Sequence, residues 1–341
     1  MSVENRVNPG ALLSGATTQI FARLNLQPRP VCDIPFWFMP SAILLEDLTK
    51  RYRDVSALNG LNLAIAEGSI FGLVGPNGAG KTTAIKILMN ILHASSGRAQ
   101  ILDWDSRDLA GRAFCSIGYV SENQKLPEWM TVSYFLAYVR NFYPTWDRDL
   151  ERELVKRFDL PTKRKLKKLS RGMRMKVALA SSLAYRPRLL VMDEPFSGLD
   201  PLVRDELIEC IVQRAGDATL LISSHDLGEM ESFATHIGYL EAGLLRFSEE
   251  LRSLTSRFRQ VELALGAAPS LPGTLPKSWM HLDVSSSTVR FIESQYDQDR
   301  TGSDIVRIFG EAALATYAPM SLRSIFLSIA RDARAAGENR A

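Results

Sequence analysis

One short segment of the chain has the residue types and spacing needed to hold a chain of phosphates. It runs Gly75-Pro-Asn-Gly-Ala-Gly-Lys-Thr-Thr83 and matches the pattern GxxxxGK[ST]. Its glycines allow a tight turn in which backbone N–H groups approach phosphate oxygens closely. Lys81 is placed to reach the outer phosphates, and Thr82 is placed to offer its hydroxyl to Mg²⁺. The residues expected to bind the phosphates are Gly75, Pro76, Asn77, Gly78, Ala79, Gly80, Lys81, Thr82 and Thr83.

The flanks of this segment favour a phosphate site over a glycine-rich turn that happens to precede a Lys-Thr pair. The apolar run Ile70–Val74 predicts a strand before it, and Lys81–Leu92 has apolar residues at helical spacing after it. A helix that begins at the phosphates adds the partial positive charge of its N-terminus. The sequence therefore predicts a nucleoside triphosphate site between a strand and a helix.

Two carboxylates follow a second apolar run, Leu189–Met192. Asp193 is suited to hold Mg²⁺ directly or through water, and Glu194, on the opposite side of the strand, is suited to polarise an attacking water molecule. An Asp-Glu pair after a strand is by itself commonly a solvated strand end. In open α/β sheets, however, ligands bind at the carboxyl ends of the strands. Beside the phosphate segment, the pair becomes a candidate metal ligand and catalytic residue.

The elements that position these residues alternate between strand and helix patterns. Further strands are predicted at 42–48, 61–65, 117–120 and 219–222, which indicates an α/β domain over residues 41–247. Within it, residues 127–186 give three helix patterns (132–142, 148–158 and 172–184) and no strand signal, so we expect an inserted helical subdomain.

Residues 1–40 have no periodicity and are expected to be a disordered extension. Met39 is an alternative translation start. Residues 248–341 are expected to form a small α+β appendage, with strands at 259–265 and 288–292, helices at 303–309 and 322–335, and a turn-rich connection around Pro269, Pro272, Gly273 and Pro276.

The composition excludes several classes of protein. The chain has 341 residues, with 41 basic and 38 acidic side chains, and this near balance gives no reason to expect a nucleic-acid or lipid partner. Its three cysteines contain no CxxC pair, so neither a zinc site nor a disulfide framework is indicated. No apolar run approaches the ~20 residues of a transmembrane helix. Work at a membrane would require a partner.

A set of motifs in a fixed order resembles the ATP-binding cassette (ABC) ATPases, and the resemblance spans residues 42 to about 247. The motifs are Gly75–Thr83, Leu169-Ser-Arg-Gly-Met173, Leu189–Pro195, Ser197-Gly-Leu-Asp200 and His225. The resemblance implies the P-loop fold of that family, with ATP and Mg²⁺ as ligands.

The resemblance also assigns roles that spacing alone leaves open. From spacing, Ser170 caps an ordinary helix; the resemblance implies that Ser170 and Gly172 contact the γ-phosphate held by a second subunit. It implies that His225 positions water together with Glu194 and that Asp200 belongs to a loop linking the two sites of a dimer. Tyr52 is similar to the aromatic residue that stacks on adenine in this family.

The chain departs from the family pattern at two places. The usual LSGGQ reads Leu-Ser-Arg-Gly-Met here, with Arg171 and Met173 as the changes. The family usually has glutamine where Glu122 stands, in contact with Mg²⁺. Glu122 is the expected equivalent, since a carboxylate also binds Mg²⁺, and Gln124 is the alternative.

The resemblance implies an ATP-hydrolysing subunit of a transporter, most similar to ABC-2-type exporters, whose C-terminal end the segment Pro319–Phe326 resembles. Expected partners are an integral-membrane permease subunit and a second ABC ATPase subunit, with no nucleic acid, at the cytoplasmic face of the cell membrane.

The aromatic-rich segment 129–146 is either helix core or a groove for the membrane subunit, and the basic run Lys163–Lys168 is expected to be a solvated loop. A soluble ABC ATPase that acts on nucleic acid or ribosomes is the alternative, but neither a long coiled coil nor a second cassette is present in the sequence.

Overall fold

The structure, a computed structural model, describes residues 41–214, 218–265, 274–310 and 314–338. These residues form two compact units that divide between Ser248 and Glu249. The expected extension 1–40, with Met39, lies outside the described residues, as do Pro269, Pro272 and Gly273.

A six-stranded sheet forms the centre of the first unit, with the strand order β10-β9-β3-β8-β7-β6. β3 pairs in parallel with β8 and β9, and β7 pairs in parallel with β6 and β8. Every residue of β3, β7 and β8 is buried, which explains their uninterrupted apolar runs. The strands are β3 (Ile70–Val74), β6 (Ile117–Ser121), β7 (Leu189–Asp193), β8 (Thr219–Ser224), β9 (His236–Glu241) and β10 (Leu244–Glu250).

A second, antiparallel sheet packs with helix α2 in the same unit. Its order is β2-β1-β4-β5, and its buried side chains share one apolar cluster with those of α2 and the central sheet. Short 3₁₀ turns η2 (Ser106–Asp108) and η3 (Gly111–Ser116) lead from β5 to β6. The other elements are β1 (Ser41–Tyr52), β2 (Val55–Ala66), β4 (Ser96–Ile101), β5 (Trp104–Asp105) and α2 (Lys81–Leu88).

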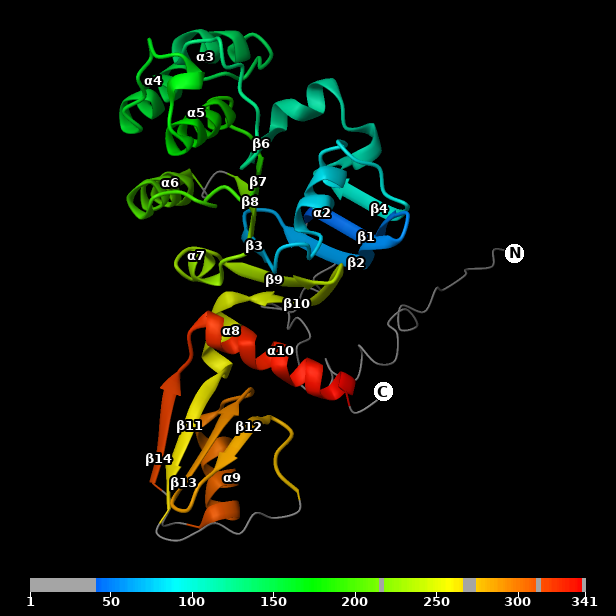
Figure 1. The fold of residues 1–341 in the computed structure, drawn as a ribbon, viewed down its shortest axis with the longest axis vertical. Helices are drawn as coiled ribbons and strands as arrows, with labels where there is room; N and C mark the ends of the chain where they lie inside the picture. The colour runs from blue at the N-terminus through cyan, green and yellow to red at the C-terminus, as the bar shows by residue number, and fades with distance from the viewer. Residues whose placement is uncertain (1–40, 215–217, 266–273, 311–313, 339–341) are drawn as a thin grey trace, which may run out of the picture. The chain divides into compact units, whose positions relative to one another are not determined.

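Three helices are inserted between β6 and β7 and lie side by side (Figure 1). Within residues 127–186 the only strand-like pairing is an isolated bridge between Thr131 and Lys165. A side chain caps the N-terminus of each helix: Thr131, Asp147 and Ser170 accept hydrogen bonds from backbone N–H groups in the first turn. The elements are α3 (Val132–Arg140), α4 (Arg148–Arg157), η4 (Leu166–Lys168) and α5 (Arg171–Leu183).

The cap of α4 is also an electrostatic contact. The backbone N–H of Leu150 and the Arg186 guanidinium, together with the N–H of Asp149, hold the pKa of Asp147 below its usual value. Asp147 therefore joins the N-terminus of α4 to the end of α5, since Arg186 follows that helix and its Nη2 lies 2.8 Å from Asp147 Oδ2. Two further helices in this unit, α6 (Pro201–Arg214) and α7 (Leu227–Glu231), follow β7 and β8 respectively.

The second unit has its own four-stranded antiparallel sheet, in the order β12-β13-β11-β14. Its core packs Val261, Trp279, Phe291 and Ile305 together. Helix α9 begins at Gln298, earlier than the pattern 303–309 suggested, because Asp297 caps it by accepting from the N–H of Arg300. The elements are α8 (Leu251–Arg257), β11 (Arg259–Ala264), β12 (Trp279–Val284), β13 (Thr288–Glu293), α9 (Gln298–Phe309), β14 (Leu314–Pro319) and α10 (Leu322–Glu338).

The predicted α/β architecture is confirmed, and each strand and helix expected between residues 41 and 247 overlaps an element of the structure, although β2 begins six residues before the expected strand 61–65. The sequence pattern did not predict β4, β5, β9, β10, α6 and α7 in the first unit, nor α8, β12 and β14 in the second.

Candidate functional site

The segment Gly75–Thr83 forms the turn between β3 and α2. A Cβ at Gly75 would lie 2.0 Å from the carbonyl oxygen of Leu240, so only glycine fits this close approach of two backbones. Gly80 has φ +109°, and a Cβ there would lie 2.5 Å from the carbonyl oxygen of Ala57. The glycines therefore fix the loop against β9 and β2 and leave Pro76, Asn77 and Gly78 exposed at its tip.

The N-terminus of α2 has no side-chain cap and no acidic residue in its first turn. Its free N–H groups and the positive end of its dipole are the usual features of an anion site. Lys81 is the first residue of this helix, and its side chain is 5% exposed. The ammonium donates to the carbonyl oxygens of Gly75 (2.7 Å) and Pro76 (3.2 Å), so it lies at the loop where phosphates would bind.

Asp193 ends β7 and is almost fully buried, with 4% of its surface exposed. Its Oδ1 accepts hydrogen bonds from the hydroxyls of Thr82 (2.9 Å) and Ser223 (2.8 Å). Burial raises the pKa of the Asp193 carboxyl, an effect that these two hydroxyls partly oppose. Thr82 and Asp193 thus bring two oxygen atoms together beside the phosphate loop.

These oxygens fit Mg²⁺, which binds one or two protein oxygens and completes its shell with water and substrate phosphates. Among the described residues, no group of three or more His, Cys, Asp and Glu side chains is arranged to hold a metal ion by itself. A site of this kind would therefore need the phosphates of a bound nucleotide for its remaining ligands.

Glu194 lies between two nitrogen groups at the same edge of the sheet. Its Oε1 is 3.1 Å from the Lys81 ammonium, and its Oε2 is 2.8 Å from Nδ1 of His225. The backbone N–H of His225 also donates to Oε2 at 3.3 Å. Glu194 has φ +51°, a left-handed conformation that is uncommon outside glycine and is often found at functional sites. The structure thus brings Lys81, Thr82, Asp193, Glu194 and His225 together.

The other residues expected to contact nucleotide lie elsewhere on the unit. Ser170 is exposed at the N-terminus of α5 and caps that helix, accepting from the N–H of Met173 at 3.2 Å. Gly172 packs against α6, where a Cβ would lie 3.0 Å from Val203. Asp200 is exposed and caps α6, accepting from the N–H of Leu202 at 2.9 Å. Ser170 and Asp200 each cap the helix that follows them, Gly172 lies where α5 meets α6, and both Ser170 and Asp200 are exposed.

Tyr52 is at the end of β1 and is 46% exposed, with the Lys50 ammonium 5.1 Å from its ring centre. An exposed ring of this kind offers a face for stacking.

Glu122 directly follows β6, and its backbone N–H donates to the carbonyl oxygen of Asp193 at 3.0 Å. Its carboxylate pairs with the guanidinium of Arg171. Gln124 turns back toward its own strand, and its Oε1 lies 3.5 Å from the N–H of Ser121. The backbone of Glu122 is therefore tied to the metal-site strand, while its side chain contacts α5.

Four aromatic side chains of the inserted helices face solvent. Trp129, Tyr134, Tyr138 and Phe142 are between 47% and 64% exposed, and the last three are spaced four residues apart along and just beyond α3. Trp129 contacts Tyr134, with ring centres 5.7 Å apart, and Tyr138 contacts Phe142 at 5.2 Å. We call these four residues the aromatic stripe. The buried side of α3 is formed by Val132, Phe135 and Leu136 instead.

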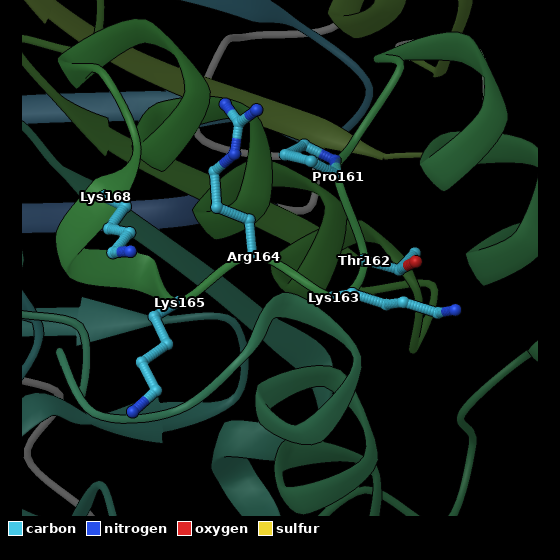
Figure 2. Close-up of a pocket in the computed structure, with 6 residues that line it drawn as sticks. All are labelled: Pro161, Thr162, Lys163, Arg164, Lys165 and Lys168. Atoms are coloured by element: carbon cyan, nitrogen blue, oxygen red, sulfur yellow. The ribbon is translucent and has the colours of Figure 1, made fainter.

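The basic loop beside α3 has an open hollow lined by Pro161, Thr162, Lys163, Arg164, Lys165 and Lys168. Figure 2 shows the charged ends of Lys163, Arg164 and Lys165 pointing in three different directions. Because these charges do not converge on one point, the loop has the geometry of a solvated surface.

Sequence reasoning missed Ser223 as a functional residue. The Ser223 hydroxyl is fully buried, donates to Asp193 and accepts from the backbone N–H of Glu194 at 3.0 Å. The signal was its position: Ser223 is opposite Asp193 in the parallel register of β8 and β7. Knowing that these strands are neighbours would have placed its hydroxyl beside the carboxylates.

The chain is similar to several known proteins. The family model described as "ABC transporter" matches residues 58–197. An uncharacterized ABC transporter ATP-binding protein of Nostoc sp. is 34% identical over 231 residues, which are 63% of this chain and 68% of the relative. The daunorubicin resistance ATP-binding protein DrrA3 of Streptomyces coeruleorubidus is 33% identical over 314 residues, which cover 86% of this chain and 97% of the relative.

Two solved structures have the same fold as the first unit. One is the ATP binding subunit of an ABC transporter, with a TM-score of 0.58 and 26% identity, covering 63% of this chain and 92% of that one. The other is a dimeric post-hydrolysis state of the ATP-binding cassette MJ0796 with ADP and Pi, with a TM-score of 0.55 and 25% identity, covering 62% of this chain and 99% of that one. Across the residues that the structure describes, no helix is both long and apolar enough to cross a bilayer.

Proposed function

Because the chain belongs to the family of ABC transporter ATP-binding proteins, we propose that it hydrolyses ATP and couples this reaction to movement of a substrate through a separate membrane subunit. The single observation that carries the proposed reaction is the placement of Glu194. Its carboxylate lies between Lys81 and His225, beside the half-buried Thr82 and the buried Asp193, which are hydrogen-bonded to each other.

The phosphates of ATP are bound by the loop Gly75–Thr83 and the uncapped N-terminus of α2. Lys81 donates to the outer phosphates, which replace its present carbonyl partners. Thr82 and Asp193, together with Glu122, would hold Mg²⁺, and the ion would neutralise negative charge on the phosphates. Tyr52 offers its exposed ring to the adenine.

Glu194 orients the water that attacks the γ-phosphate and accepts a hydrogen bond from it. His225 holds the Glu194 carboxylate through Nδ1 and its backbone N–H, which leaves its other ring nitrogen free to face the γ-phosphate. Ser223 fixes the backbone of Glu194 in its left-handed conformation.

The second anion site is supplied by another subunit. Ser170 and Gly172 stand at the N-terminus of α5, where Ser170 is exposed, and Asp200 is exposed six residues after Glu194. ATP bound at Gly75–Thr83 of one subunit would meet Ser170 and Gly172 of the next, so that nucleotide holds two cassettes together. Loss of the γ-phosphate removes this bridge, and the subunits separate. The dimeric state of the similar cassette MJ0796 supports this arrangement.

The aromatic stripe is proposed as the contact for a short helix of the membrane subunit. Large exposed aromatic side chains are typical of protein contacts, and permease partners are general in this family. The relatives named for daunorubicin resistance favour an exporter of the ABC-2 type at the cytoplasmic face of the membrane. Isolation of the native complex tests the partner: a multi-span protein supports transport, whereas ribosomal RNA or DNA would support a role on nucleic acid.

The reaction is tested by Glu194→Gln. This variant keeps the size and the hydrogen-bonding oxygen of the side chain but loses its charge. We expect ATP turnover to fall by about 10²-fold or more, while the equilibrium affinity for ATP stays within a few-fold of wild type. Turnover at the wild-type rate would contradict the role of Glu194.

A further inference from the structure

Arg171 connects α5 to the loop after β6. It is the first residue of α5, and its Nη2 donates to Oε1 of Glu122. The two side chains are 44% and 26% exposed. Both residues depart from the family pattern, which usually has glycine where Arg171 stands and glutamine where Glu122 stands, and the structure pairs them with each other.

The same guanidinium also packs on the turn that follows Glu194. A Cβ built on Gly198 would lie 3.0 Å from Nη1 and 3.3 Å from Cζ of Arg171. Gly198 has φ +63°, so its backbone already requires glycine, and the guanidinium occupies the space that a side chain would take. Arg171 therefore touches two separate segments, 121–124 and 197–200.

Both segments are attached to the edge of the sheet that carries the catalytic residues. The N–H of Glu122 donates to the carbonyl oxygen of Asp193 at 3.0 Å, and the N–H of Ser197 donates to that of Glu194 at 3.3 Å. A displacement of α5 would therefore reach Asp193 and Glu194 through these two short connections.

We propose that Arg171 is a positioning residue that fastens the N-terminus of α5 to segments 121–124 and 197–200, and so holds Ser170 and Asp200 in one arrangement for the second subunit. This inference rests on the proposed function, because it assigns Arg171 a part in ATP-driven pairing. A planar guanidinium suits this role, since its fork of donors can engage a carboxylate while its flat face covers a glycine.

The contact between Arg171 and Glu122 is expected to affect local opening more than the stability of the whole protein. A partly exposed ion pair contributes little to global stability, but it restrains the local opening of the segments that it joins. Amide hydrogen exchange on the full-length, nucleotide-free protein measures that opening directly.

Arg171→Ala should raise exchange about tenfold in both segments. Glu122→Gln should raise it in 121–124 alone, because Arg171 still covers Gly198 in that variant. Arg174→Ala is the matched control: it removes the same charge from the exposed face of α5 and should leave both segments at wild-type exchange. Wild-type exchange in Arg171→Ala, or an equal effect of Arg174→Ala, would overturn the proposal.

A second measurement separates positioning from a general loss of structure. In the hydrolysis-blocked Glu194→Gln protein, Arg171→Ala should weaken ATP-driven pairing about tenfold, because a less ordered surface must be ordered on binding. ATP affinity of the isolated subunit should remain within about twofold, since the phosphate loop is untouched. Arg171→Lys, which keeps the charge and reaches Glu122, should recover part of the loss.

Equal pairing in Arg171→Ala and its parent would contradict the inference while leaving the proposed function intact. Failure of the Glu194→Gln parent itself to pair with ATP would instead contradict the proposed function, and the exchange result on the single subunit would still decide the inference.

Discussion

Ser223 offers a precise test of how the carboxylate pair is held. Its hydroxyl has no exposed surface and makes two hydrogen bonds, donating to Asp193 Oδ1 at 2.8 Å and accepting from the N–H of Glu194 at 3.0 Å. Ser223→Ala removes both with little change in volume. It deprives a buried carboxylate of one of its two hydroxyl donors and leaves a backbone N–H without this partner.

The expected cost follows from these two losses. A hydrogen bond to a charged group contributes about 1.5–3 kcal/mol, and leaving a buried donor unsatisfied costs about 1–3 kcal/mol. Because the two losses share one site and can relax together, we expect the free energy of unfolding to fall by about 3 kcal/mol. Chemical denaturation measures this difference.

Metal dependence should change as well. The Ser223 hydroxyl lowers the pKa of Asp193 against the larger, opposite effect of burial. Without it, the pKa rises further, and since only the ionised carboxylate binds Mg²⁺, the acid limb of ATP turnover should move to higher pH. The half-saturating Mg²⁺ concentration at neutral pH should rise about tenfold, equivalent to about 1.4 kcal/mol.

Ser224→Ala is the matched control for this substitution. Ser224 is equally buried, at 1% exposure, but its hydroxyl bonds Glu229 Oε2 at 2.5 Å and accepts from the N–H of Asp226 at 2.9 Å. The Ser224→Ala protein should lose about as much free energy of unfolding as Ser223→Ala, and it should keep the wild-type Mg²⁺ dependence of ATP turnover. The reasoning is refuted if Ser223→Ala keeps wild-type stability and Mg²⁺ dependence, or if the control shifts the Mg²⁺ dependence equally.

Three further predictions concern the loop, a helix cap and the aromatic stripe. Gly75→Ala should prevent folding of the first unit or abolish ATP binding, because the Cβ meets the Leu240 carbonyl oxygen at 2.0 Å and neither backbone can retreat; a folded variant with normal ATP affinity would disprove this. The lowered pKa of Asp147 means that its ionised form contributes stability that is complete above its unfolded pKa of about 3.9 and is lost as the pH falls through the lower folded value. Asp147→Asn keeps a capping oxygen, so its free energy of unfolding should fall less than that of wild type between about pH 5 and pH 3. An equal fall in both proteins, measured by denaturation at each pH, would exclude this. Replacing Tyr138 and Phe142 together by Ala should leave stability within about 0.5 kcal/mol and ATP turnover of the isolated subunit unchanged, but should abolish co-purification of the membrane subunit; an intact complex would rule out the stripe as the contact.

Local sequence signals were sufficient for the buried parts of the fold. β7 and β8 are enclosed on both faces, and each therefore contains a short unbroken apolar run, Leu189–Met192 in β7 and Leu220–Ile222 in β8. The strand β4 (Ser-Gly-Arg-Ala-Gln-Ile) begins with three exposed residues, one of them a glycine, so the sequence gives no periodic signal. Its conformation comes from pairing with β1, a contact that no local pattern reveals.

The same distinction separates the site residues. The phosphate loop is continuous in sequence, and each of its glycines can be interpreted locally. Ser223 acquires a role only through the register that places it opposite Asp193. Arg171 and Glu122 are separated by 49 positions and belong to different elements, so a pair of flexible, oppositely charged side chains at that separation gives no signal until the fold brings them together.

The central claim is that ATP binds between two cassettes and holds them together, because neither cassette encloses the nucleotide by itself. Sedimentation velocity of the Glu194→Gln protein, with and without ATP and Mg²⁺, tests it most directly. The account predicts a monomer without nucleotide and a dimer with it, and a monomer again when Ser170 is replaced by a bulky acidic residue. A Glu194→Gln protein that stays monomeric at saturating ATP, and that has no second cassette in its native complex, would contradict the account.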